Sequence, residues 1–366
     1  MKRDLKVVLT LILVFLLTGA FNVRGETLHE AVKSVLQNNP EVSSVAYNKL
    51  AREQEVNQVM SDFYPKVDTL LSAGYNDQSH PYDDNNHPNS ARVRLSQNVF
   101  RGGVTLSETK RQQSRVASQA YLLQGTSENS ALLTCKVYLD YLRALEQYEL
   151  AKENLAIHLR FFDQIKLRSQ AGVDRGVDFD QINARLSLAK SNLVVTQAHI
   201  ENAKADYLAV VGYLPVNLVK PEPAYSLIPS TLQEAEKQAL DNHPILKSAK
   251  ADVEARQYQM KTAKGLVYPS VDVNAEYVWG DDISGPFVTS HYQEYFQAYA
   301  TLSFNIFNGL NNKARIKETK YLINEAEKIA QKTEWQTTHA IRLSYEQYKA
   351  DLRRINELEQ YVDATG

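Results

Sequence analysis

A long internal duplication constrains the fold of this 366-residue chain more than any other feature of its sequence. Residues 27–31, Thr-Leu-His-Glu-Ala, return 204 residues later at 231–235 as Thr-Leu-Gln-Glu-Ala. Further along, residues 99–102 return 207 residues later at 306–309, each time with Phe in second place and Gly in last place. Solenoid repeats have periods of about 20 to 50 residues. The sequence therefore predicts a duplicated half-protein.

Alternating apolar and polar residues predict one β-hairpin in each repeat. The first hairpin spans 66–100, with a polar loop between its strands, and the second spans 270–307. A side-chain period of two is typical of strands with one apolar face. In the second hairpin we expect this face to be formed by the following residues: Val271, Val273, Tyr277, Trp279, Phe304 and Ile306.

Helical periodicity predicts very long helices after each hairpin. A helix-turn-helix spans 104–212, and its first helix runs to about residue 171, on the order of 100 Å at 1.5 Å per residue. Gly125 opposes this prediction, since an interior glycine costs about 1 kcal/mol relative to alanine. The second repeat has Lys332 at the corresponding position, and residues 310–365 contain neither Gly nor Pro. We therefore expect uninterrupted helices and a fold of the α+β class.

The first 25 residues are typical of a secretory signal peptide. Basic residues precede an apolar run from Val7 to Leu17, and small residues follow it. An anchor helix that stays uncleaved is the alternative, although the run is shorter than the roughly 18 to 20 residues that a spanning helix needs. We expect a signal peptide at 1–25, a first repeat at 26–225 and a second repeat at 226–366.

The predicted strands are long enough to cross a membrane. About ten residues tilted near 45° span a bilayer, and aromatic residues gather near the predicted strand ends. In a membrane, the six residues expected on the apolar face of the second hairpin would face the lipid. A soluble antiparallel sheet packed on helices would show the same alternation. Four strands cannot close a barrel, and open sheet edges in lipid leave backbone groups unsatisfied. A membrane barrel must therefore be shared. Two chains would give eight strands around a filled lumen, whereas three would give twelve strands around a passage.

The order of these features in two copies resembles the TolC family of outer-membrane export proteins. The features are the helix starts at 39–40 and 243–244, the Tyr-Pro pairs at 64–65 and 268–269, the two Phe-x-Gly turns, and Gly172 followed six residues later by Asp178. The resemblance runs from about residue 27 to the end of the chain. Residues 176–186 are most similar to members that secrete large adhesins or agglutination factors. The resemblance implies a long α-helical barrel of coiled-coil-like helices, joined to a transmembrane β-barrel that three chains share.

The resemblance also implies a function, partners and site residues. It implies a passive conduit from periplasm to exterior, in the outer membrane, that serves type I secretion of proteins or drug efflux. The implied partners are two sister copies, outer-membrane lipid, a periplasmic membrane-fusion adaptor and an inner-membrane ABC or RND transporter. The adaptor-docking tip and the aperture would be formed by Ala171, Gly172, Val173, Asp178 and Asp180. From the residues alone, Gly172 equally fits a helix end and Asp178 a helix cap.

Other function classes have less support in the sequence. A soluble periplasmic coiled-coil scaffold or adaptor without a barrel is the alternative function. The eight His show no ligand spacing, and neither a Gly-rich phosphate loop nor a nucleophile elbow is present, so we expect no enzyme and no cofactor. His80, Asp83, Asp84 and His87 could together bind a metal, but a solvated surface loop is the favoured interpretation. With 41 basic and 43 acidic residues, charge gives no reason to expect a nucleic-acid partner.

The second repeat is expected to be C-terminally incomplete. With a spacing of 207 residues, the counterpart of the Gly172 turn falls near residue 379, beyond the last residue of the sequence. We therefore expect one complete pair of tunnel helices and one unfinished pair in this chain.

Overall fold

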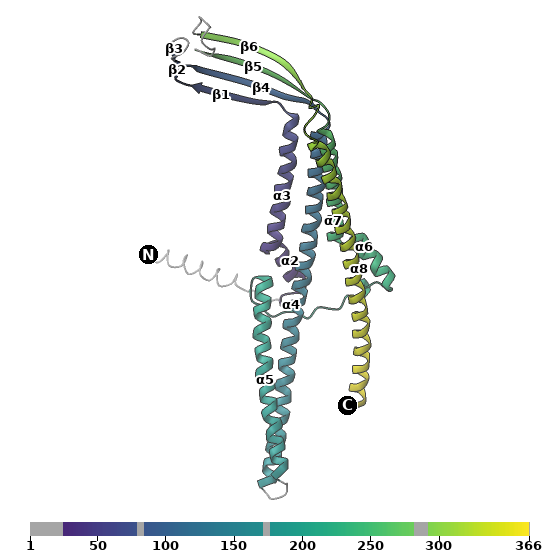
Figure 1. The fold of residues 1–366 in the computed structure, drawn as a ribbon. Helices are drawn as coiled ribbons and strands as arrows, with labels where there is room; N and C mark the ends of the chain where they lie inside the picture. Colours follow the sequence, from purple (N-terminus) through teal and green to yellow (C-terminus); the bar gives the residue numbers. More distant parts are fainter. Residues whose placement is uncertain (1–24, 79–83, 171–175, 282–291, 366) are drawn as a thin grey trace, which may run out of the picture. The chain divides into compact units, whose positions relative to one another are not determined.

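The computed structural model describes residues 25–78, 84–170, 176–281 and 292–365 of the chain. Long helices and a curved sheet dominate it (Figure 1). The signal peptide expected at 1–25 lies, apart from its last residue, outside the described residues. The elements have the following bounds: α2 Leu28–Asn38, α3 Pro40–Met60, η1 Ser61–Phe63, β1 Lys66–Ala73, β2 Asn76–Gln78, β3 Asp84–Asn86, β4 Asn89–Arg101, α4 Val104–Gln170, α5 Gly176–Val211, η2 Tyr225–Leu227, α6 Leu232–Asn242, α7 Pro244–Gly265, β5 Ser270–Asp281, β6 Tyr292–Ser303 and α8 Asn311–Thr365.

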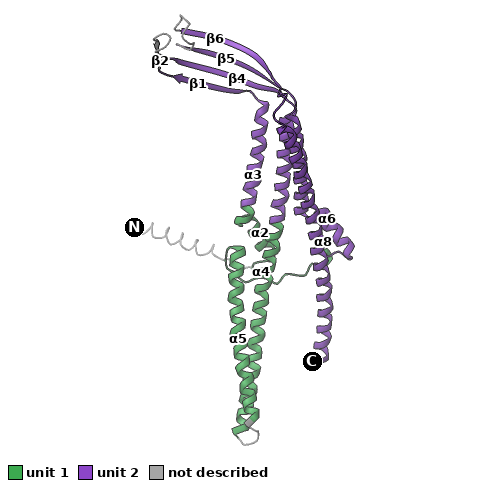
Figure 2. Ribbon diagram, viewed as in Figure 1, with its two compact units in different colours: residues 1–43, 127–227 green, residues 44–126, 228–366 purple. Residues whose placement is uncertain are grey.

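The chain divides into two compact units (Figure 2). Unit 1 consists of residues 1–43 and 127–227, and its described part holds α2, α5 and the second part of α4. Unit 2 consists of residues 44–126 and 228–366, and holds the strands, the first part of α4 and the helices α6 to α8. Unit 1 thus comes from the first half of the sequence, whereas unit 2 takes segments from both halves.

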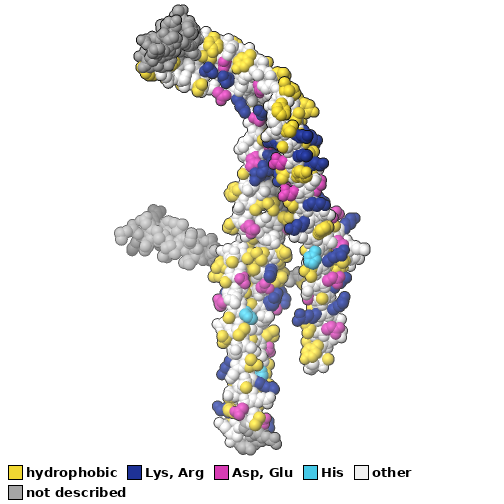
Figure 3. Space-filling model, viewed as in Figure 1, with side chains coloured by type: hydrophobic (Ala, Val, Ile, Leu, Met, Phe, Trp, Pro, Cys, Tyr) yellow, Lys and Arg dark blue, Asp and Glu magenta, His cyan; other side chains and the backbone are white. Residues whose placement is uncertain are grey.

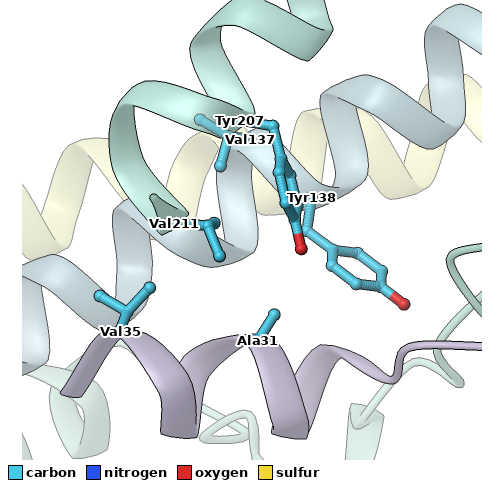
Figure 4. Close-up of a cluster of buried hydrophobic side chains, with 6 residues drawn as sticks. All are labelled: Ala31, Val35, Val137, Tyr138, Tyr207 and Val211. Carbon is cyan, nitrogen blue, oxygen red and sulfur yellow. The ribbon is translucent and has the colours of Figure 1, made fainter. Parts of the chain in front are cut away.

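The core of unit 1 is a cluster of buried side chains between three helices (Figure 4). Two cluster residues come from each of α2, α4 and α5, and the rings of Tyr138 and Tyr207 are its largest members. Both tyrosine side chains are fully buried, so they contribute most of the apolar area that this small core removes from water. The full cluster is Ala31, Val35, Val137, Tyr138, Tyr207 and Val211.

A tyrosine contact recurs in both repeats. The hydroxyl of Tyr138 donates to the carbonyl oxygen of Glu26 at 2.8 Å. In the second repeat, 207 residues later, the hydroxyl of Tyr345 donates to the carbonyl oxygen of Ser230 at 2.9 Å. Ser230 follows Glu26 by 204 residues, which is the spacing of the repeat in that part of the sequence. The duplication is therefore kept in hydrogen bonds as well as in residue types.

Unit 2 contains a four-stranded antiparallel sheet in the order β1-β4-β5-β6. The hairpin of each repeat supplies two neighbouring strands. The two hairpins join side by side, because β4 of the first pairs with β5 of the second from Asn89 and Asp281 to Arg101 and Ser270. A register shift at Asn98 and Phe100 interrupts this pairing near the helix end of the strands. One continuous sheet is thus built by both repeats.

Two details of the hairpins differ from the expectation. The sequence predicts a polar loop between β1 and β4, whereas β2 and β3 form a two-stranded sheet there. The sequence also predicts that the last strand reaches residue 307, but β6 ends at Ser303, so Phe304 and Ile306 lie beyond it. The chain leaves the ladder here because it turns into α8 through Gly309 and Leu310, both with positive φ.

The long helices are continuous, as predicted. α4 passes through Gly125 without a break, and α8 runs unbroken from Asn311 to Thr365. A Cβ atom at Gly125 would lie only 2.6 Å from Cδ1 of Ile245 at the start of α7. Gly125 is therefore explained by the close approach of α7, which outweighs its low helix propensity. Within the described ranges, no helix combines the length and the hydropathy needed to span a membrane.

Candidate functional site

One face of the four-stranded sheet is apolar and exposed, and we refer to it as the apolar sheet face. The register aligns its side chains in rows across the strands, such as Thr69, Val93, Tyr277 and Phe296. Phe296 is 68% exposed, and hydrophobic side chains lie along the sheet and gather where it meets the helices (Figure 3). Water is an unfavourable solvent for so large an apolar surface. Its exposed members are Val67, Leu71, Leu95, Val273, Tyr277, Trp279, Phe296 and Leu302.

The predicted lipid-facing residues fall on this face in β5. The strand register places Val271, Val273, Tyr277 and Trp279 on the apolar sheet face. Val271 is half-buried, and the other three side chains are exposed. The ring centroids of Tyr277 and Trp279 lie 5.6 Å apart. Phe304 and Ile306 are also exposed, Ile306 to 88%, but they follow the end of β6 and belong to the turn into α8.

The opposite face of the sheet is mixed: it carries charged and polar side chains together with Leu70, Val278, Tyr295 and Tyr299. Asp68, Arg94, Glu276 and Gln297 form one row across all four strands. Arg94 donates to the carboxylate of Glu276 at 3.0 Å, and the amide of Gln297 donates to the same carboxylate. The side chain of Glu276 is only 5% exposed, so these partners compensate for its removal from water. No local pattern in the sequence indicates this row, because its members come from four strands in two repeats.

β1 and β6 form the two edges of this sheet. Among the described residues, no strand pairs with the outer side of either edge. An unpaired edge presents N–H and C=O groups that can pair with a further strand. A sheet with an exposed apolar face and two open edges has the properties of one segment of a larger closed assembly.

The helical hairpin of α4 and α5 carries the predicted aperture residues. Ala171, Gly172 and Val173 lie outside the described residues. Asp178 and Asp180 lie in the first turns of α5, and both are exposed. A carboxylate in the first turn interacts favourably with the positive end of the helix dipole, so Asp178 also stabilises α5.

A ring contact fixes the direction of these two carboxylates. Phe179, between Asp178 and Asp180, packs against Phe162 of α4 with a centroid distance of 5.6 Å. Because consecutive helix residues lie about 100° apart, Asp178 and Asp180 project to either side of this contact. The hairpin thus presents two carboxylates to solvent close to its tip.

A second polar cluster surrounds Glu26 in unit 1. Its carboxylate accepts hydrogen bonds from the hydroxyls of Tyr207, at 3.0 Å, and Tyr213. Burial, followed by the hydrogen bond to Glu26, raises the pKa of both tyrosines above the ordinary value. Tyr207 lies 181 residues from Glu26, so no local pattern in the sequence indicates this contact. We interpret the cluster as structural, since it ties the start of the described chain to α5.

The described residues offer no candidate metal centre. Within residues 25–78, 84–170, 176–281 and 292–365, no group of three or more His, Cys, Asp or Glu side chains is arranged to hold a metal ion. Of the four loop residues that the sequence offers as possible metal ligands, His80 and Asp83 lie outside those ranges.

Comparisons with known proteins agree with this geometry. The chain matches the family model described as outer membrane efflux protein over residues 31–212 and 236–366, well over half of its length. It is 25% identical to Outer membrane efflux protein BepC of Brucella suis biovar 1 over 263 residues, which cover 71% of this chain and 57% of BepC. It is 24% identical to Protein CyaE of Bordetella pertussis over 338 residues, which cover 89% of this chain and 69% of CyaE.

The fold is similar to that of solved outer-membrane proteins. The structure of the outer membrane protein VceC from Vibrio cholerae superposes with a TM-score of 0.76 at 17% sequence identity. The match covers 91% of this chain and 81% of VceC. It therefore includes both the helices and the sheet.

Proposed function

The chain belongs to the outer membrane efflux protein family, and on this premise we propose that it forms the outer-membrane channel-tunnel of a tripartite export system. It is a protein of the outer membrane, with its helical part in the periplasm. Both the family and the fold are those of channel proteins. The proposed role is a passive one, in which cargo moves from the periplasm to the exterior through a conduit that performs no chemistry.

The observation that carries the proposal is the four-stranded sheet with one apolar face and two open edges. In lipid, each unpaired backbone group costs several kcal/mol, so β1 and β6 must find partners. Sister copies supply them if β6 of one chain pairs with β1 of the next. The apolar sheet face then contacts lipid, and the row that includes Arg94 and Glu276 lines the lumen.

We propose a homotrimer for this assembly. Two chains would give eight strands, whose lumen side chains fill, whereas three chains give twelve and leave a passage. A soluble periplasmic scaffold without a barrel is not favoured, because the family match includes both hairpins and the apolar sheet face would stay uncovered in water.

The length of the helices supports the proposed partners. α4 alone spans on the order of 100 Å, far more than a bilayer, and extends the conduit into the periplasm. We propose that the α4–α5 tip, including Ala171, Gly172 and Val173, docks a periplasmic membrane-fusion adaptor. The adaptor in turn connects the tunnel to an inner-membrane ABC or RND transporter. That transporter selects the cargo, whether a secreted protein such as an adhesin or a drug.

We further propose that Asp178 sets the ion preference of the tunnel. Three copies of an exposed carboxylate near the hairpin tip form a negative ring in the homotrimer, and such a ring favours cations. Asp180 adds to the same field. The tip then acts both as a docking surface and as an electrostatic filter.

Single-channel recording in a planar lipid bilayer tests this function. The purified chain is expected to insert and to conduct with a preference for K⁺ over Cl⁻, and Asp178→Asn is expected to reduce that preference. The matched control is Asp206→Asn, an exposed carboxylate on the same helix about 42 Å further along. This control should leave the ion preference unchanged. A chain that never conducts contradicts the conduit, and equal effects of the two variants contradict the role of Asp178.

A further inference from the structure

A groove lies in unit 2 where the last strand turns into α8. It has a volume of about 420 Å³, within the range of small-molecule sites. Ile306 and Phe307 line it from the turn, and Lys313 and Lys317 line it from the first turns of α8. The described residues that line it are apolar side chains, asparagines and these two lysines, without a carboxylate. The groove is thus apolar and cationic at once.

The apolar part of the groove continues the apolar sheet face. Leu302, at the end of β6, is 69% exposed, and Ile306 and Phe307 just beyond it are 88% and 77% exposed. Figure 3 shows hydrophobic side chains gathered at this junction and Lys and Arg side chains on the helices beside it. A surface that changes from apolar to cationic over a few residues matches the boundary between acyl chains and headgroups.

The two lysines can act on one anion. They are four residues apart in α8, so their side chains leave the same side of the helix with Cβ atoms about 6 Å apart. Both are exposed, and no carboxylate among the described residues lies within ion-pair distance of either ammonium group. The first repeat has Leu106 at the position of Lys313, so this pair is confined to the second repeat.

Backbone strain marks the same place. Leu310 lines the groove with a φ of 69°, in the left-handed region that disfavours side chains. The first repeat has Gly103 at this position, with a φ of 74°, and glycine adopts that conformation without strain. The second repeat therefore keeps a leucine at a conformational cost, and the leucine side chain forms part of the groove wall.

We propose that this groove binds an anionic phospholipid of the periplasmic leaflet, with its phosphate between Lys313 and Lys317 and its acyl chains against Ile306, Phe307 and Leu310. The inference rests on the proposed function. The strands meet the helices at this end of the sheet, and the helices lie in the periplasm, so the groove opens at the inner surface of the outer membrane. Charge complementarity favours an anionic headgroup over a zwitterionic one.

Native mass spectrometry of the detergent-extracted protein tests the proposal. The protein is titrated with phosphatidylglycerol or with phosphatidylcholine, and the retained lipid is counted. We expect preferential retention of phosphatidylglycerol. Lys313→Gln and Lys317→Gln should each weaken it about fivefold, the effect of one cation near a membrane surface. Lys320→Gln, an exposed lysine on α8 outside the groove, is the matched control and should have no effect.

A second variant separates lipid binding from folding. Leu310→Gly relieves the strain, so it should keep or raise the stability of the protein while it weakens retention of phosphatidylglycerol. Equal retention of the two lipids, an equal effect of Lys320→Gln, or displacement of the lipid by millimolar inorganic phosphate would overturn the site. A chain that leaves the membrane without detergent overturns the proposed function as well, whereas a detergent-dependent chain without lipid preference overturns this inference alone.

Discussion

Gly280→Ala is expected to break the outer end of the junction between the two hairpins. Gly280 lies in β5 opposite Ser90 of β4. A Cβ atom there would lie 2.1 Å from the carbonyl oxygen of Asn89 and 2.7 Å from Cα of Ser90. Both neighbours are backbone atoms of the paired strand, so no side chain can move aside to make room.

The magnitude follows from the distances. A carbon needs roughly 3.3 Å from an oxygen, so the two strands must separate locally by about 1.2 Å. A ladder hydrogen bond with a donor–acceptor distance of about 2.9 Å would then lengthen beyond the range of protein hydrogen bonds. Of two neighbouring pairs in an antiparallel ladder, Ser90 with Gly280 and Asn89 with Asp281, one exchanges two hydrogen bonds, which are worth about 1–3 kcal/mol together.

Equilibrium urea unfolding in phospholipid vesicles, followed by tryptophan fluorescence, measures this loss. Gly74→Ala is the matched control, because a Cβ atom there would lie 3.4 Å from Cγ of Pro88, an ordinary contact in the first hairpin. The control should change the free energy of unfolding by less than about 1 kcal/mol. If Gly280→Ala is as stable as the parent protein, or if the control loses as much, the close packing of β4 on β5 is refuted.

Two further predictions concern unit 1. Tyr138→Phe removes the hydroxyl that holds the carbonyls of Glu26 and Val219, so it should destabilise unit 1 by about 1 kcal/mol and speed proteolysis in the 212–227 loop. Tyr345→Phe, the counterpart in unit 2, should leave that cleavage unchanged, and equal cleavage in both variants would contradict the assignment. The pKa of Tyr207 is raised in the folded protein. Its contribution to the free energy of unfolding should therefore be complete below the tyrosine pKa of the unfolded chain, about 10, and should be lost as the pH rises above that value. Circular dichroism should therefore show a shallower alkaline loss for Tyr207→Phe, and an unchanged slope would count against the raised pKa.

Periodicity predicted the long elements well, because each of them carries a local pattern. Helical periodicity predicted α4, the absence of Gly and Pro predicted α8, and the period of two predicted β5. The same pattern misplaced the end of the last strand. The alternation continues through Phe304 and Ile306, but these two residues lie beyond β6. They belong to the turn into α8, in which Gly309 and Leu310 have positive φ.

The features that the sequence did not reveal depend on contacts between distant residues. Gly125 looked unfavourable within its own helix, and its role became clear only beside Ile245 of α7. The pairing of Arg94 with Glu276 joins two repeats and follows from the register of β4 on β5. For Asp178, the sequence and the structure agree on a position at the start of a helix, and its role in the aperture stays a prediction.

Cross-linking between sheet edges tests the shared barrel most directly. Within one chain, β1 and β6 are separated by two strands, which is about 14 Å at 4.8 Å per spacing. In a Cys135→Ser background, Thr69→Cys on β1 is combined in turn with Phe296→Cys, Ala298→Cys or Ala300→Cys on β6, and outer membranes are treated with a cross-linker shorter than about 8 Å. Neighbouring copies in a closed barrel should give a ladder of products that ends at three chains. Monomers at every position, or a ladder that ends at two chains, would contradict the account.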